Sequence, residues 1–180
     1  MEEDIIEKLR HQDIQAQELL YKKYANKMFR ICYRYIGSEC DASEILNDGF
    51  YKVFVQIKSF RDGGLQGLVA WMSKIMVNEC LQFIRKRKKI RFVNESEALA
   101  EQSPISPDIR IEAEDYFELI KQLGDSYRTV FNLFVIEGYS HKDISEMLNI
   151  PENTSRSHLL RARQELKKKI ENKYCYENRK

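Results

Sequence analysis

The sequence is poor in turn-forming residues, with 7 glycines and 3 prolines among 180 residues. Strand-rich folds need many such residues at their turns, so this scarcity favours helices. No apolar run reaches the roughly 18 residues that a membrane helix needs. The acidic start, Met1–Asp4, also lacks the apolar core of a secretion signal. We therefore expect a cytoplasmic chain that is not itself a membrane protein.

Motifs of catalysis and metal binding are also lacking. The four cysteines form no C-x-x-C pair, and His11, His141 and His158 have no partners at metal-ligand spacing. The sequence contains no glycine-rich phosphate loop, and no carboxylate belongs to a recognisable motif with His, Cys or Ser. We therefore expect no metal, no cofactor and no catalytic residue, and we expect the thiols to stay reduced.

Charge is abundant but segregated. Charged residues make up 32% of the chain although the formal net charge is only +2. One basic run is Arg85–Lys89, and a second cluster extends from Arg156 to Lys169. Two local basic patches on a nearly neutral chain indicate two contacts with polyanions rather than general stickiness.

Apolar periodicity predicts helices on both sides of an irregular stretch. Asp13 can cap a helix that runs to about Ile36, and Asp41 with Glu44 has the spacing of a capping box for the next helix. Periodicity fails between about residues 91 and 110, where serines and prolines gather. We therefore expect an all-α fold of two small helical domains, residues 1–90 and 111–180, joined by a flexible linker at 91–110.

The C-terminal part has the pattern of a helix-turn-helix. Ser140 and Asp143 form a capping box for a short helix, Asn149–Pro151 is a tight turn, and a longer helix starts near Glu152. Ser155 shares the packing face of that last helix with Leu159. The other face carries the candidate DNA contacts Asn153, Arg156, Ser157, Leu160, Arg161 and Arg163. An ordinary solvated helix face is the alternative, but the preceding helix and turn favour DNA binding.

Three stretches of this part resemble the fourth conserved region of the sigma factors of bacterial RNA polymerase, in particular the extracytoplasmic-function subgroup of the sigma-70 family. They are Leu123–Phe131 (LGDSYRTVF), Glu137–Ser145 (EGYSHKDIS) and Asn153–Arg163 (NTSRSHLLRAR). In the N-terminal half, Glu18–Tyr24 (ELLYKKY) and Asp41–Phe50 (DASEILNDGF) resemble the second region of the same family. The resemblance covers about residues 13 to 170.

The resemblance implies a role for each part of the chain. Core RNA polymerase would be bound through Glu44, Asn47, Asp48 and Lys52. The promoter element nearest the start site (−10) would be melted and read by Phe60, Arg61, Trp71, Lys74, Asn78 and Arg85. The more distant element (−35) would be read as duplex by the last helix. Family members are also commonly held inactive by an anti-sigma factor, so that partner is implied as well.

Several positions keep a second interpretation. Trp71 is in phase with Leu68 and Ile75, so it fits the core as well as a base-stacking platform. Phe60 sits at a loop and fits either role, and the run Arg85–Lys89 fits a solvated surface that contacts phosphate non-specifically. The chain also departs from the family pattern: Ser155 stands where the family usually has Val, and Gly49 is unusual within a helix.

Three other functions fit the sequence less well than that of a sigma factor. An enzyme lacks a supporting motif. A stand-alone helix-turn-helix regulator would need a dimer interface and a palindromic site, whereas the N-terminal half resembles a polymerase-binding module. A helical adaptor would leave the residues of the last helix unexplained.

Overall fold

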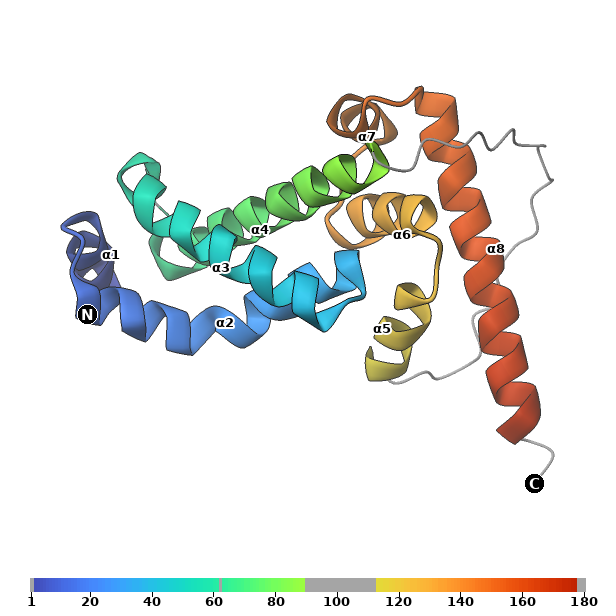
Figure 1. Cartoon of the computed structure of the whole chain (residues 1–180), viewed down its shortest axis with the longest axis horizontal. Helices are drawn as coiled ribbons and strands as arrows, with labels where there is room; N and C mark the ends of the chain where they lie inside the picture. The colour runs from blue at the N-terminus through green and yellow to red at the C-terminus, as the bar shows by residue number, and fades with distance from the viewer. Residues whose placement is uncertain (1, 62, 90–112, 178–180) are drawn as a thin grey trace. The chain divides into compact units, whose positions relative to one another are not determined.

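The computed structural model describes residues 2–61, 63–89 and 113–177. Within these ranges the regular structure is helical, with no strand, which confirms the expected all-α fold with two small helical domains. The chain divides into two compact units, Met1–Phe92 and Val93–Lys180. Both are drawn in Figure 1, and each is described by itself. The linker expected at 91–110 lies outside the described residues.

The first unit is built from α1 (Glu2–Arg10), α2 (Ile14–Ile36), α3 (Glu39–Gln56), the short 3-10 helix η1 (Ile57–Ser59) and α4 (Gly64–Lys89). Helices α2, α3 and α4 each pack against the other two, and α1 contacts α2, α4 and η1 (Figure 1). The largest fully buried side chains of this core are Leu9, Leu20, Met28, Tyr35, Phe50, Ile57, Leu68, Met72, Met76 and Leu81.

The ends of α2 lie where the sequence predicted them. The side chain of Asp13 accepts a hydrogen bond from the backbone N–H of Ala16 at 2.8 Å, which satisfies a free donor of the first turn. Gly37 ends the helix with a φ of 77°, a left-handed conformation that glycine adopts without steric cost.

The expected start of α3 at Asp41 was wrong. The cap is Ser38, whose backbone is extended and whose side chain accepts a hydrogen bond from the N–H of Asp41, and the helix begins at Glu39. Because Gly37 turns the chain immediately after α2, Ser38 is the first polar side chain placed to cap. Asp41 instead lies in the first turn, where its negative charge favours the helix dipole.

The second unit contains α5 (Ala113–Lys121), α6 (Asp125–Phe131), the π-helix η2 (Asn132–Ile136), α7 (His141–Leu148) and α8 (Glu152–Glu177). Residues from α5, from the turn after it and from α8 form its buried cluster: Leu119, Ile120, Leu123, Ala162 and Leu166. Tyr127, Phe131 and Ile170 pack against that cluster, so α8 is held at its middle by apolar burial.

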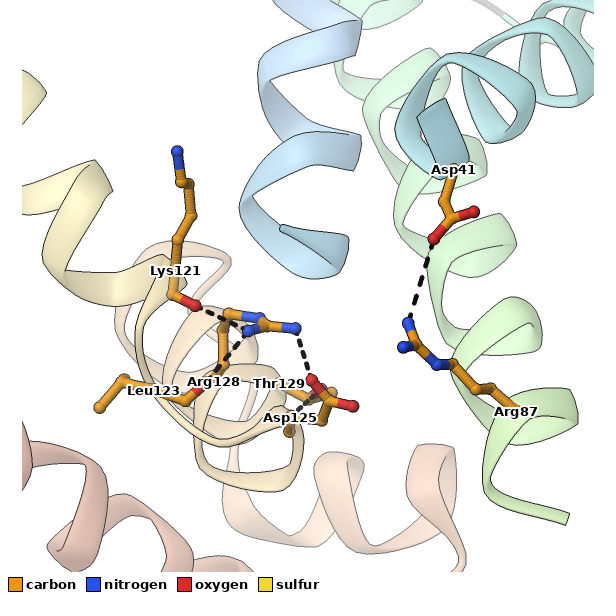
Figure 2. Close-up of polar contacts among 7 residues, drawn as sticks. All are labelled: Asp41, Arg87, Lys121, Leu123, Asp125, Arg128 and Thr129. Carbon is orange, nitrogen blue, oxygen red and sulfur yellow. Dashed lines mark hydrogen bonds and ion pairs between the residues drawn. The ribbon is translucent and has the colours of Figure 1, made fainter. Parts of the chain in front are cut away.

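Arg128 holds the corner between α5 and α6 (Figure 2). Its guanidinium donates to the carbonyl oxygens of Lys121 and Leu123 at 2.9 and 3.0 Å, and it pairs with Asp125 at 2.7 Å. Two carbonyls at the end of a helix thereby gain donors that the helix itself does not supply. The corner is fixed by a side chain that is only 7% exposed.

Candidate nucleic-acid interface

Helices α7 and α8 form the helix-turn-helix that the sequence predicted. Ser140 and Asp143 make both hydrogen bonds of a capping box at the start of α7. Asn149 ends α7 with a φ of 53°, so the chain reverses at once and α8 begins at Glu152. Ile144 is fully buried, and α7 packs on α8. A short helix is therefore held against the start of a long one.

The start of α8 has one packed face and one open face. Ser155, Leu159, Ala162 and Leu166 are buried, as their spacing of four, three and four residues predicted. Asn153, Arg156 and Arg163 are exposed, and Ser157, Leu160 and Arg161 are partly buried. Arg156 forms an ion pair with Glu152 one turn earlier, and Ser157 donates to the carbonyl of Thr154. The structure thus leaves the proposed base-reading residues on the accessible side, and their roles stay predictions.

His141 links three elements of this unit, which the sequence did not reveal. Its Nδ1 lies 2.9 Å from Oγ of Ser155, and its ring stacks on Phe134 of η2 with centroids 4.4 Å apart. Burial lowers the pKa of His141, and the charges of Arg156 and Arg163 lower it further. The one feature of the sequence that pointed to this contact was the polar Ser155 on an otherwise apolar face of α8.

The residues proposed for the −10 element gather along one side of α4. Lys74, Asn78 and Arg85 are exposed, and their spacing from Trp71 places all four on one side of the helix. Trp71 is partly buried. Arg61, in the segment before α4, is exposed as well. A row of polar and cationic side chains beside an aromatic ring is suited to binding single-stranded nucleic acid.

Phe60 has a different environment from the other −10 candidates. It is 6% exposed, and its ring lies 5.6 Å from that of Trp71, centroid to centroid. In this structure the Phe60 ring therefore supports Trp71 and offers little area to a base. A direct base contact by Phe60 stays a prediction and would require the ring to move.

The residues proposed to bind polymerase lie on α3. Glu44, Asn47 and Asp48 are exposed, while Lys52 forms an ion pair with Glu79 of α4 at 2.7 Å. Lys52 is thus already engaged within the unit, and its side chain is 36% exposed. The structure places the acidic candidates Glu44 and Asp48 on one exposed side of α3, whereas Lys52 is ion-paired with Glu79 of the neighbouring helix.

Sequence reasoning missed two residues of this surface. Tyr51 and Val55 are 70% and 58% exposed. With Glu44 and Asp48 they follow a spacing of four, three and four residues, so the four form one stripe along α3. The same spacing test that found the core would have found this acidic and apolar stripe.

A groove runs beside this stripe, between α3 and α4. Its lining includes Glu44, Asp48 and Glu79 on one part and Lys86 and Arg87 on another. Arg87 reaches back to Asp41 at 4.0 Å, the second ion pair drawn in Figure 2. One residue of the basic run, Arg87, therefore contacts α3 while its side chain stays 47% exposed.

Across the described ranges, no group of three or more His, Cys, Asp or Glu side chains is placed to hold a metal ion. None of the helices described here is both long and apolar enough to cross a membrane.

Two family models match the chain in order. The model for Sigma-70 region 2 matches residues 20–90, and the model for Sigma-70, region 4 matches residues 113–166. The first range spans most of α2, α3, η1 and α4, and the second runs from α5 to the middle of α8. The matches thus cover the residues proposed for the −35 element, for the −10 element and for polymerase binding.

Several proteins similar to this chain are named as ECF RNA polymerase sigma factors. It is 29% identical to the ECF RNA polymerase sigma-E factor of Haemophilus influenzae, over 93% of this chain and 94% of that one. It is 29% identical to the ECF RNA polymerase sigma factor SigW of Bacillus subtilis, over 82% and 84%. It is also 29% identical to SigE of Mycolicibacterium smegmatis, of which it spans 59%.

A solved structure has the same fold. It is the sigma factor RpoE from Bartonella quintana in complex with the anti-sigma factor NepR, with a TM-score of 0.50 and 21% identity. The match covers 86% of this chain and 96% of that one.

Proposed function

As a member of the extracytoplasmic-function subgroup of the sigma-70 family, this chain is an RNA polymerase sigma factor and not an enzyme, and we propose that its two units divide promoter recognition between them. The observation that carries this proposal is the order of the two matched regions along one chain. A stand-alone regulator would need the second match only. The chain then binds core RNA polymerase and directs initiation at specific promoters.

The second unit reads the −35 element as duplex DNA. The start of α8 enters the major groove, where Arg156 and Arg161 are placed to contact base edges. Asn153, Ser157, Leu160 and Arg163 complete that surface. The accessible face at the N-terminal end of α8 supports this assignment, because that end of a recognition helix meets the bases.

The first unit opens and reads the −10 element. Lys74, Asn78 and Arg85 hold the backbone of the unpaired strand along one side of α4, and Trp71 with Arg61 faces its bases. Their shared side of the helix and their exposed cations support this role. Phe60 contributes by supporting Trp71.

Core polymerase binds the stripe of α3. Glu44 and Asp48 supply negative charge in its first half, and Tyr51 and Val55 supply apolar area in its second half, with Asn47 and Lys52 at its margins. A surface of this kind suits a partner that offers basic and apolar side chains. Aromatic residues such as Tyr51 are frequent energetic centres of protein interfaces.

We place the protein in the cytoplasm, where core polymerase and promoter DNA are found. An anti-sigma factor completes the set of partners, by analogy with the Bartonella quintana protein whose complex is solved. No residue of this chain is assigned to that contact.

Run-off transcription with purified core RNA polymerase and the full chain tests the proposal. Start sites mapped on genomic templates should share two upstream elements. The opposite result would be no promoter-specific transcript, together with binding of the chain alone, as a dimer, to a palindromic site. That result would replace the sigma factor with a stand-alone regulator.

Asp48→Lys tests the polymerase surface. The substitution reverses a charge at an exposed position, so core binding should weaken by up to a few kcal/mol while folding is nearly unchanged. Glu18→Lys makes the same reversal on α2 and serves as the control. Undiminished co-purification of Asp48→Lys with core polymerase would remove α3 from the interface.

A further inference from the structure

The corner between α1 and α2 is bonded to a distant part of the first unit. Nη2 of Arg10 donates a hydrogen bond to the carbonyl oxygen of Phe60 at 3.1 Å. Nε2 of Gln12 donates to the carbonyl oxygen of Phe54 at 2.9 Å. Both acceptors lie at the end of the α3–η1 segment, where helix carbonyls lack partners within the helix. One corner thus supplies two donors to one end of another segment.

Helix α1 is a fixed support for these donors. Ile6 and Leu9 are 5% and 1% exposed, so its apolar side is buried in the bundle. Its contacts reach α2, α4 and η1. Arg10 also forms an ion pair with Glu7, at 3.2 Å between Nη1 and Oε2. That pair is exposed to solvent and therefore weak, so the bond from Nη2 to Phe60 does not depend on it.

Two glycines follow soon after Phe60 and Arg61. Gly63 and Gly64 have φ values of 143° and 58°, which are conformations that glycine adopts readily and other residues rarely do. Glycine also gives a chain the largest conformational entropy. The bond from Arg10 restrains the backbone at Phe60, just before Arg61 and these glycines.

We propose that Arg10 is a positioning residue for reading the −10 element. By holding the carbonyl of Phe60 it fixes the backbone that carries Arg61, and it keeps the Phe60 ring against Trp71. Arg10 touches no base itself. The benefit is preorganisation, because unpaired bases then meet side chains that are already in place. This inference rests on the function proposed for the first unit.

The test uses the full chain assembled with core polymerase and a fork-junction DNA whose −10 element is unpaired. The probe pair is this fork and a second fork in which the unpaired bases are substituted. The measured quantity is the ratio of the two affinities. Arg10→Met keeps the aliphatic stem and removes the donors, Arg10→Lys restores one donor, and Glu7→Gln removes the ion pair but leaves the bond to Phe60.

We expect Arg10→Met to lower the ratio about two- to tenfold, the range for loss of one hydrogen bond that positions a site. Arg10→Lys should recover part of it, and Glu7→Gln should match the wild type. Binding to core polymerase and to duplex −35 DNA should not change. Because the measured quantity is a ratio, a smaller folded fraction affects both forks equally and leaves it unchanged.

An unchanged ratio in Arg10→Met overturns the inference. An equal loss on both forks also overturns it, since it would show a structural role alone. Failure of the underlying function gives a different result. In that case the wild-type holoenzyme itself would not distinguish the two forks.

Discussion

Gly49 of α3 lies directly against the side chain of Met76 of α4. A Cβ atom at position 49 would be 2.3 Å from Sδ and 2.9 Å from Cε of that methionine. Met76 is fully buried, so its side chain has little room to move away. The glycine that looked out of place within a helix is therefore explained by the close approach of two helices.

Gly49→Ala should destabilise the first unit although alanine is the better helix former. Alanine gains about 1 kcal/mol of helix propensity, while overpacking a filled core costs about 1–3 kcal/mol. We expect a net loss of up to about 2 kcal/mol. Trp71 is the single tryptophan and lies in this unit, so its fluorescence during urea unfolding reports the change. Ser43→Ala, at an exposed position of α3, is the control and should stabilise; equal stabilisation by both would contradict the packing argument.

Arg128→Ala should cost the second unit about 3 kcal/mol, because it leaves two helix-end carbonyls without a donor and Asp125 without its cation. Arg128→Lys should recover only part of the loss, since one ammonium cannot reproduce the planar fork of a guanidinium. Hydrogen exchange of α5 and α6 in the full chain is the measurement. Wild-type protection in Arg128→Lys would show that charge alone holds the corner.

Ser155→Val should destabilise the helix-turn-helix by about 1 kcal/mol. From the sequence alone, the apolar phase of Ser155 predicts the opposite sign, a gain of similar size. The hydrogen bond to His141 reverses this expectation, because valine fills the space but removes the partner. Exchange protection of α7 and α8 measures the effect, and Ser155→Ala, which removes the same hydroxyl, should lower protection as well. Increased protection in Ser155→Val would restore the first expectation.

The second unit should lose stability as the pH falls from about 7 to 5.5. Burial and the charges of Arg156 and Arg163 on α8 hold the pKa of His141 below its ordinary value of 6.5, with Glu152 opposing them. On its own helix, Lys142 and Asp143 flank it. The unfolded chain therefore binds a proton before the folded one does, and stability is complete above about pH 7 and decreases below 6.5.

The measurement for this pH effect is urea unfolding of the full chain at several pH values, followed by exchange in α7 and α8. His141→Gln is the control and should flatten the dependence. A His141 resonance that titrates above 6.5 in NMR spectra would give the wrong sign and reject the prediction.

Arg156→Ala and Arg161→Ala should change which bases are preferred in the −35 element. Removing a base-reading arginine costs about 1–3 kcal/mol at its own base pair. Lys168→Ala, two to three turns further along α8, should weaken all sequences alike and lower the salt slope by about 1. Holoenzyme binding to single-base promoter variants at several salt concentrations distinguishes these results. Uniform losses in both arginine variants would make them phosphate clamps and move base reading to Asn153, Ser157 or DNA shape.

Local signals in the sequence predicted more of this molecule than its long-range contacts. Asp13, the end of α2 at Ile36 and the Ser140–Asp143 capping box are set by residues close by in the sequence, and each was placed correctly. Helix α1 was missed because it is only 9 residues long and begins with acidic residues, which leaves little apolar periodicity to detect. The bond from Arg10 to Phe60 joins residues 50 positions apart, and no periodicity reports such a contact.

The candidate site shows the same limit. Burial of Ser155 followed from its phase on α8, whereas its bond to His141 depends on how two helices pack. Exposure of Arg156 and Asp48 was predictable from helical phase. The burial of Phe60 was not, because a loop residue has no phase to read.

The π-helix after α6 behaves like a one-residue insertion. The N–H of Glu137 bonds to the carbonyl of Asn132, five residues earlier, instead of four. Residues beyond this turn are therefore shifted by one position relative to the periodicity of α6. Phe134 stacks on His141 with its ring tilted by only 21°. In an alignment of relatives, a chain one residue shorter at 132–136 would carry a different residue to this place, and its helix-turn-helix would need another contact in place of the histidine.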